Sequence, residues 1–585
     1  MKKKGKWLAL PLALLMGMSV FAGCSLEQVG EEVDATRTTL RVGTYTGGVD
    51  ASWLDGVKER FEAKYADTCF EPGTDKKGVQ VIITPDKTIY HGSSIMNNIA
   101  GLSDAVIFTE NVDYHSAAAS GLLLDVSDIF GENLSEKFGE NKTIRSKMYD
   151  EEWEFIQHNG GVYGVPHYML LGGIQYDVDL FEENNLYFNE AGTGFVRSAT
   201  EARSAGSDGD FSTTYDNGLP ATYDDFFKLC DEMLLRGITP IAWSGYYQKI
   251  QTYYTLWALI ADYEGPTNFM ANFNFDETVD DIVTSITPSS DGTFENIDVQ
   301  TRTAEITPEM GYELRQQAGY YYALKFFERI VDGPTDPAVL ALPNHSYYDR
   351  TTAGSMVSHL GAQENFIKGY WEGSPIGMLC DGAWWENEAS GLNGAFETAV
   401  AEFGPEASRE NHRYGFMPLP KATSEQVGDP YTLANFGQCY GVINKNAVEG
   451  DENLIALSKL FLQFCCTDPE LAEFTLTTGM PKSFKYDIDD TRVAQEMTYF
   501  QQTVWSIYEN AELLQPYSGQ TLLKNNKSTL GYGHDIYTTV NNQSYGIPVT
   551  AFIDTNITAE QYFFGMKMSA EDWNMTYGRD LATVS

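Results

Sequence analysis

The alternation of apolar strand patterns with helical patterns near the start of the chain constrains the fold most. Residues 39–45, 79–84 and 104–108 have the pattern of strands, and residues 52–64 and 93–100 have that of helices between them. Such alternation is typical of βαβ units, which build a parallel sheet covered by helices. Ligands of these sheets bind at the carboxyl ends of the strands. The sequence therefore predicts an α/β fold whose site begins where the first and third strands end.

The second half of the chain continues this pattern. Apolar runs at 238–243 and 376–380 predict two more strands. Thr307 and Pro308 are a good N-cap and first helical residue, so they predict the start of a helix. The apolar residues that follow predict that this helix continues without interruption to about Val331.

The charge of the chain restricts its partners. The 585 residues include 82 acidic and only 39 basic side chains, for a net charge of −43. Such a surface repels phosphate backbones, which argues against a nucleic acid partner. A carboxylate or phosphate ligand usually needs arginine or lysine, whereas a neutral polyol needs no cationic pocket. The composition therefore favours a neutral ligand.

The first 23 residues have the pattern of a secretory signal peptide. Four lysines precede an apolar stretch, residues 7–22, that is too short for a comfortable membrane span. The ending Phe-Ala-Gly-Cys24 resembles a bacterial lipobox, whose cysteine becomes diacylated after cleavage. We expect a lipid on Cys24, a polar tether over residues 25–38, and a location at the outer face of the bacterial cytoplasmic membrane. The alternative is a plain signal peptide followed by an unrelated Cys24.

The other cysteines do not indicate a metal site or a disulfide scaffold. They form no C-x-x-C motif and no cluster beyond one adjacent pair. We expect buried thiols, and a disulfide at Cys69 remains an alternative. These cysteines are Cys69, Cys230, Cys380, Cys439, Cys465 and Cys466.

Short motifs along the chain resemble one protein family in their order and spacing. They cover nearly the whole chain after the signal segment, and each is weak alone. They are LRVGTY (40–45), DAVIFT (104–109), GGVYGVP (160–166), QYDVDLF (175–181), PATYDDF (220–226), MLCDGAWW (378–385), YGFMPLP (414–420) and GMP (479–481). Together they resemble the extracellular solute-binding proteins of ABC importers, in the carbohydrate-type group called family 1. The chain departs from the family in length, because of stretches near 189–218, 287–305 and 505–550.

The resemblance implies a type II periplasmic-binding-protein-like fold. This is an α/β fold of two lobes with mixed sheets flanked by helices and a hinge between the lobes. The implied function is to bind a sugar in the cleft between the lobes and deliver it to the transmembrane subunits of an ABC permease. We expect a monomer without a cofactor or a metal ion. The expected lobes are residues 39–164 with 434–490, and residues 165–433 with 491–585.

The resemblance also implies which residues hold the ligand. An indole face buries the flat C–H patch of a pyranose, and the family places an aromatic at the position of Trp384 or its neighbour Trp385, with Trp384 favoured by the match. Asp381 is expected to accept sugar hydroxyls, with a helix N-cap as its alternative role. Independently of the resemblance, Tyr45, Thr46, Glu110 and Asn111 are expected to contact the ligand because they follow predicted strands. The resemblance adds Tyr168, Trp243, Tyr246, Tyr247 and Phe436.

Two other functions stay open at this stage. A secreted glycoside hydrolase needs two carboxylates that flank one bond, and Glu386 and Glu388 lie beside the tryptophans. Two residues separated by one position on a helix point about 200° apart, so this pair does not face one substrate. The chain also has no G-x-S-x-G, H-E-x-x-H or Walker motif. The remaining alternative is a binder of a non-sugar solute such as a peptide.

Overall fold

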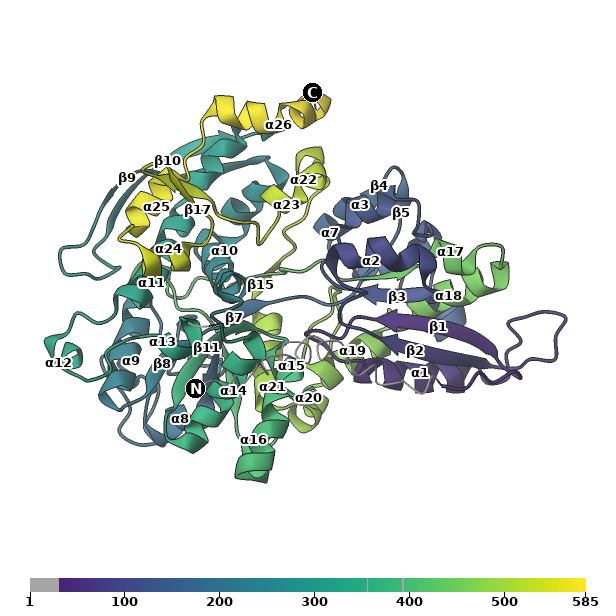
Figure 1. Ribbon diagram of the computed structural model, residues 1–585, viewed down its shortest axis with the longest axis horizontal. Helices are drawn as coiled ribbons and strands as arrows, with labels where there is room; N and C mark the ends of the chain where they lie inside the picture. Colours follow the sequence, from purple (N-terminus) through teal and green to yellow (C-terminus); the bar gives the residue numbers. More distant parts are fainter. Residues whose placement is uncertain (1–30, 355, 392–393, 585) are drawn as a thin grey trace, which may run out of the picture.

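The computed structural model describes residues 31–354, 356–391 and 394–584, which form two lobes (Figure 1). The predicted signal segment and Cys24 lie outside the described residues. A helix long and apolar enough to cross a membrane is not found in the described part of the chain.

The first lobe is built on a five-stranded mixed sheet. Its strand order is β2 (Val79–Pro85), β1 (Thr38–Thr44), β3 (Val106–Thr109), β14 (Tyr440–Ile443) and β6 (Val165–Pro166). β1 pairs in parallel with β2 and β3, whereas β14 returns from far along the chain and pairs antiparallel with β3 and β6. The three parallel strands are the ones that the sequence predicts.

The second lobe is built on a four-stranded sheet. Its order is β12 (Tyr414–Met417), β7 (Gly172–Asp177), β11 (Ile376–Gly382) and β8 (Thr239–Ala242). β11 is parallel to β8 and antiparallel to β7. Every residue of β7, β11 and β12 is buried, because helices cover the sheet. The predicted fold class, two α/β lobes with mixed sheets flanked by helices, is therefore confirmed.

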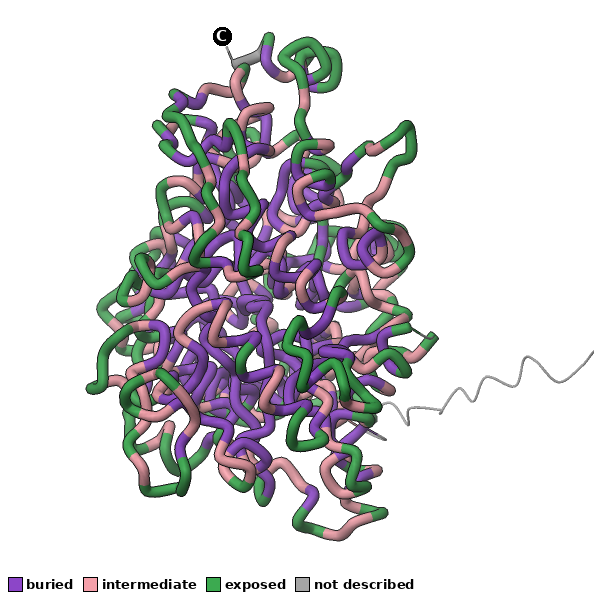
Figure 2. The backbone as a smooth tube through the Cα atoms, turned by 90° about the vertical axis from the view of Figure 1, so that its left-hand side faces the viewer, coloured by how far each residue is buried: buried purple, intermediate pink, exposed green. Residues whose placement is uncertain are grey.

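Helices pack on both sheets and complete the hydrophobic core. α1 (Ser52–Lys64), with the bounds that the sequence predicts, buries Leu54, Val57 and Phe61 toward the first sheet and packs on α19 (Asp468–Thr478). In the second lobe, α10 (Gln248–Asn274) packs on β7 and β11. Buried segments fill the interior and exposed segments form the outside (Figure 2).

The prediction of one continuous helix from Thr307 to Val331 is wrong, because the helix is interrupted. A 3-10 helix, η2 (Pro308–Gln316), is followed by α11 (Ala318–Asp332), and the extended Gln317 separates them. The buried Glu264 carboxylate causes this break, since it accepts hydrogen bonds from Gln317 Nε2 at 3.1 Å and from the Gly319 N–H at 2.6 Å. A continuous helix would bond the Gly319 N–H to its own backbone instead.

One connection between the lobes is a segment that we call the strap, residues 515–534. It contains α22 (Thr521–Asn525) and α23 (Lys527–Leu530), which lie between the lobes in Figure 1. Lys524 Nζ donates to the Glu154 carbonyl of the first lobe at 2.8 Å. Ser518 Oγ donates to the Phe273 carbonyl of the second lobe at 2.7 Å.

The division of the chain into lobes at 164/165, 433/434 and 490/491 stays a prediction. β6 belongs to the sheet of the first lobe and β7 to the sheet of the second lobe. The chain therefore passes from one lobe to the other after Pro166. The cysteines of the described region are free thiols, all buried except the exposed Cys69.

Candidate ligand-binding cleft

A cavity of about 880 Å³ lies between the two lobes and is lined by side chains of both. From the first lobe, Tyr45 and Thr46 follow β1 and Glu110 follows β3. From the second, Asp381 belongs to the end of β11 and Trp384 follows it. The cavity therefore forms where strand ends from two sheets face one another, within the range of volumes typical of small-molecule sites.

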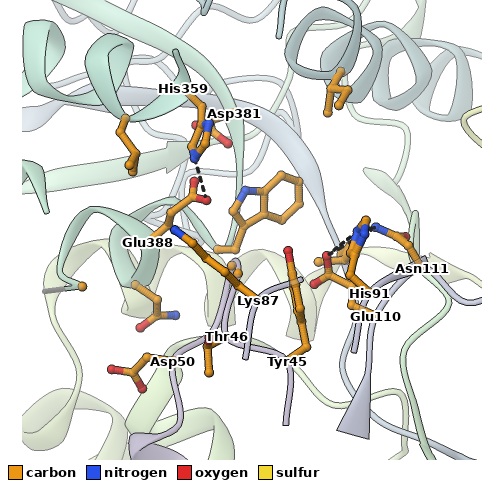
Figure 3. A pocket seen from close by; sticks show the side chains of 18 of the residues that line it. Tyr45, Thr46, Asp50, Lys87, His91, Glu110, Asn111, His359, Asp381 and Glu388 are labelled. Atoms are coloured by element: carbon orange, nitrogen blue, oxygen red, sulfur yellow. Dashed lines mark hydrogen bonds and ion pairs between the residues drawn. The ribbon is translucent and has the colours of Figure 1, made fainter. Parts of the chain in front are cut away.

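The structure brings seven of the predicted ligand residues to this cavity. Six of them follow or end a strand, which is why a pattern of strands could locate them. Figure 3 shows Tyr45 and Glu110 on one side of the cavity and Asp381 on the other. The seven are Tyr45, Thr46, Glu110, Asn111, Tyr247, Asp381 and Trp384.

Two predicted tryptophans lie in the core instead. Trp243 is fully buried and stacks on Tyr348, with ring centroids 5.0 Å apart. Trp385 is fully buried and packs edge-on against Tyr414 and Phe500. Both side chains are turned away from the cavity, so neither lines it.

Three predicted aromatics lie beside the cavity without lining it. Tyr168 is buried behind Glu110 and donates its hydroxyl hydrogen bond to that carboxylate. Phe436 packs edge-on against Tyr254, with centroids 4.5 Å apart. Tyr246 is largely exposed outside the cavity. Tyr168 and Phe436 thus support residues of the cavity wall.

Sequence reasoning missed several polar residues of the wall. Lys87 and His91 follow β2, and Gln251 comes from the first turns of α10. His359 begins α14 (His359–Glu372), and Glu388 belongs to α15 (Trp385–Ala389). The sequence could have indicated Lys87 and His91 as wall residues, because both follow the end of a predicted parallel strand. No sequence pattern indicates the three helical residues, since only the packing of the helices decides which face meets the cleft.

Glu110 is a buried acceptor at the base of the first-lobe wall. Its Oε2 accepts from the Tyr168 hydroxyl, and its Oε1 accepts from Asn111 Nδ2 at 3.3 Å. His91 Nε2 lies 3.8 Å from Oε1. Burial raises the pKa of Glu110 to about 7, although the Tyr168 hydrogen bond opposes this rise. No lysine or arginine among the described residues forms an ion pair with this carboxylate.

A hydrogen-bonded network of carboxylates and amides forms the second-lobe wall. Asp381 accepts from Gln251 Nε2 at 2.9 Å and from Gln363 Nε2 at 3.3 Å, and the same Gln363 nitrogen donates to Glu388 at 2.8 Å. Burial, and then the charge of Glu388, raises the pKa of Asp381 to about 7. His359 Nε2 lies 3.2 Å from Glu388 Oε1. A dashed line marks this interaction in Figure 3. Burial alone would lower the pKa of His359, but the contact with Glu388 outweighs it and raises that pKa.

The Trp384 side chain packs against the ring of Tyr254 and against two glycines. The ring of Tyr254 packs edge-on against it, with centroids 4.6 Å apart. A Cβ placed on Gly48 of the first lobe would lie 2.9 Å from the Trp384 Cβ, and one on Gly382 would lie 2.2 Å from its ring. Glycine at these two positions therefore lets the backbone approach the indole from both lobes.

Comparison with known proteins gives structural likeness only. No protein-family model and no curated protein matches the chain. A chitin oligosaccharide binding protein is 14% identical, covering 92% of this chain and 99% of its own, with a TM-score of 0.49. A family 1 extracellular solute-binding protein from Bifidobacterium longum subsp. infantis is 13% identical over 92% and 99%, with a TM-score of 0.45. A cyclic alpha-maltosyl-1,6-maltose binding protein from Arthrobacter globiformis is 11% identical over 93% and 100%, with a TM-score of 0.48.

At TM-scores of 0.45–0.49 the likeness assigns neither a function nor a ligand to this chain. The function has to follow from the chemistry of the cleft itself.

Proposed function

We propose that this chain is the lipid-anchored receptor of an ABC importer and binds a neutral sugar or oligosaccharide between its lobes. The observation that carries the proposal is the composition of the cavity wall. It combines an indole, three tyrosine rings and a set of carboxylates with one lysine, Lys87, among the described residues that line it. A transmembrane permease would receive the sugar from the closed form of the protein.

The wall suits sugar hydroxyls and the apolar face of a sugar ring. Trp384 offers a flat surface to axial C–H bonds, and Tyr45 and Tyr254 add further aromatic area. Glu110 and Asp381 provide buried oxygen acceptors for hydroxyl donors. An anionic ligand would meet Glu110, Asp381 and Glu388, and Lys87 is the one lysine or arginine among the described lining residues, so such a ligand is disfavoured.

Binding without cleavage fits the placement of the acidic residues. Glu386 and Glu388 point apart, as the helical spacing predicts: Glu388 lines the cavity, whereas Glu386 is buried and accepts from Thr498 Oγ1 at 2.8 Å. Glu386 and Glu388 therefore do not flank one glycosidic bond, as a hydrolase would require. We propose a receptor that releases its sugar intact.

A melting screen tests the proposed function. The protein lacking residues 1–24 is heated with neutral mono- and oligosaccharides, with uronic acid oligomers and with short peptides. At least one neutral glycan should raise the melting temperature, because a ligand that binds only the folded state stabilises it by RT ln(1 + [L]/Kd). Chromatography of the incubated glycan should recover it uncleaved. A shift with peptides alone, or cleaved fragments, would contradict the proposal.

The lipid anchor needs its own experiment, because Cys24 lies outside the described residues. The full chain and its Cys24→Ala variant are expressed in a Gram-positive host, and membrane and soluble fractions are compared. The unaltered chain should stay with the membrane and the variant should leave it. Retention of the variant at the membrane would overturn the anchor.

A further inference from the structure

Three large exposed apolar side chains border the cavity: Ile250 and Leu360 line it, and Tyr246 packs against Tyr247 of its wall. Tyr246 is 55% exposed, Ile250 43% and Leu360 37%. Ile250 and Leu360 also line the cavity, so they belong both to its wall and to the outer surface. We call these three residues the rim patch. Grouped exposed apolar residues on a soluble protein mark a surface that binds something.

Hydrogen bonds join the two segments that carry the rim patch. Tyr246 lies just before α10, Ile250 lies in its first turn, and Leu360 lies in the first turn of α14. The Tyr246 N–H donates to the Val357 carbonyl at 3.0 Å. Ser244 Oγ donates to the same carbonyl oxygen at 2.8 Å. These hydrogen bonds thus tie the segment before α10 to the segment before α14.

A row of rings connects the rim patch with the interior of the cavity. The ring of Tyr246 packs edge-on to that of Tyr247, with centroids 4.7 Å apart. Tyr247 packs edge-on to His359 at 5.0 Å, and His359 bonds to Glu388 inside the cavity. A ligand that leaves the cavity along this side would therefore pass from polar partners to aromatic surface without a gap.

We propose that the rim patch is an outer subsite for an oligosaccharide longer than the cavity encloses. This inference rests on the proposed function. A linear, neutral glycan would place its first units between Trp384 and the carboxylates and continue over Ile250 and Leu360 to stack on Tyr246. The three patch side chains carry no charge, which suits the C–H faces of neutral sugar units. The occupant is continuous with the ligand of the cavity because Ile250 and Leu360 line both.

Calorimetry with chains of increasing length tests the subsite. The probes are α-1,4-linked glucose, β-1,4-linked xylose and β-1,4-linked N-acetylglucosamine chains of one to six units. In the series that binds, Tyr246→Ala should leave the Kd of the shortest bound chain within about twofold. It should raise the Kd of the longest chain about five- to tenfold, as expected for one lost stacking contact. Trp384→Ala should weaken all lengths.

Two variants serve as controls. Tyr246→Phe keeps the ring and should keep the preference for long chains. Phe211→Ala removes another exposed ring, 58% exposed and outside the cavity wall, and should change no Kd. If Tyr246→Ala changes long and short chains equally, or neither, the subsite is refuted while the proposed function stands. If the unaltered protein binds no chain of any series, both the proposed function and the subsite are refuted.

Discussion

Trp384 and Trp385 show how much depends on one residue position. The two are adjacent, yet Trp384 lines the cavity and Trp385 is packed in the core. Neighbouring residues of a helical turn point about 100° apart, so only one of them can face the cleft. Of the two indoles, Trp384 is therefore the one that a ligand in the cavity can contact.

Replacing Trp384 should weaken sugar binding strongly. We expect Trp384→Ala to raise the Kd about tenfold or more, because it removes the main apolar face of the site. Trp384→Phe retains a ring and should lose less. Calorimetry with the best glycan of the melting screen measures both. A Kd for Trp384→Ala within a factor of three of the unaltered protein would show that the indole does not stack on the sugar.

A buried acid outside the cleft, Glu152, should make stability depend on pH. It belongs to α7 (Asp150–Ile156) and accepts from Ser483 Oγ at 2.6 Å. Burial raises the pKa of Glu152 to about 8, from an ordinary value of 4.5. The folded state thus binds the proton more tightly than the unfolded state does. The stabilising contribution is complete below about pH 4.5 and is lost as the pH rises through about 8.

Glu152→Gln should remove this dependence. At pH 5 the variant and the unaltered protein should melt alike, since glutamine resembles the protonated acid. At pH 9 the variant should be more stable by on the order of 2–4 kcal/mol. Melting curves at both values test this, with the exposed Glu136→Gln as a control that should show no such divergence. Equal stability of Glu152→Gln and the unaltered protein at pH 9 would rule out a buried, protonated Glu152.

At the scale of elements, the break in α10 determines what its first half can reach. Gly265 has φ 65° and ψ −178°, and Pro266 follows it. A residue before proline avoids the helical conformation, and this positive φ favours glycine. The first half of α10 is therefore free to point Gln251 and Tyr254 at the cleft, while the second half follows another direction.

Gly265→Ala should cost stability by its backbone conformation alone. A Cβ at this position would meet nothing within 4 Å, so no clash contributes. We expect a loss of about 1–2 kcal/mol in the free energy of unfolding, measured with denaturant. Gly101→Ala is the matched control, because it also meets open space but has no positive φ, and it should be nearly neutral. If Gly265→Ala leaves the free energy of unfolding unchanged, the backbone at this position does not require glycine.

At the scale of the whole molecule, the structure has the lobes in contact across the cleft. Gly48 of the first lobe lies against Trp384 of the second, and the cavity is lined from both sides. We propose that a sugar enters a more open arrangement of the lobes and that binding then selects the closed one.

Small-angle scattering should detect this closure. The radius of gyration should fall when a glycan from the melting screen saturates the protein, and the scattering curve should then match the structure. A glycan that gives no melting shift serves as the control and should leave the radius unchanged. If the bound and free proteins scatter identically, the lobes do not close on the ligand in solution.

The sequence by itself determined the parallel strands and most of the strand-end residues of the cleft. β1, β2 and β3 follow from local apolar patterns, and the carboxyl ends of neighbouring parallel strands must meet at one edge. This is why Tyr45 and Glu110 could be placed before the structure was known.

Only the tertiary structure decided which helical side chains complete the site. Glu388 and His359 come from two helices of the second lobe, and no local pattern records which face of a helix will meet the cleft. The break at Gln317 likewise depends on Glu264, a partner more than fifty residues away. Local patterns set strands and caps because their energetics are local, whereas contacts between distant segments depend on how the whole chain packs.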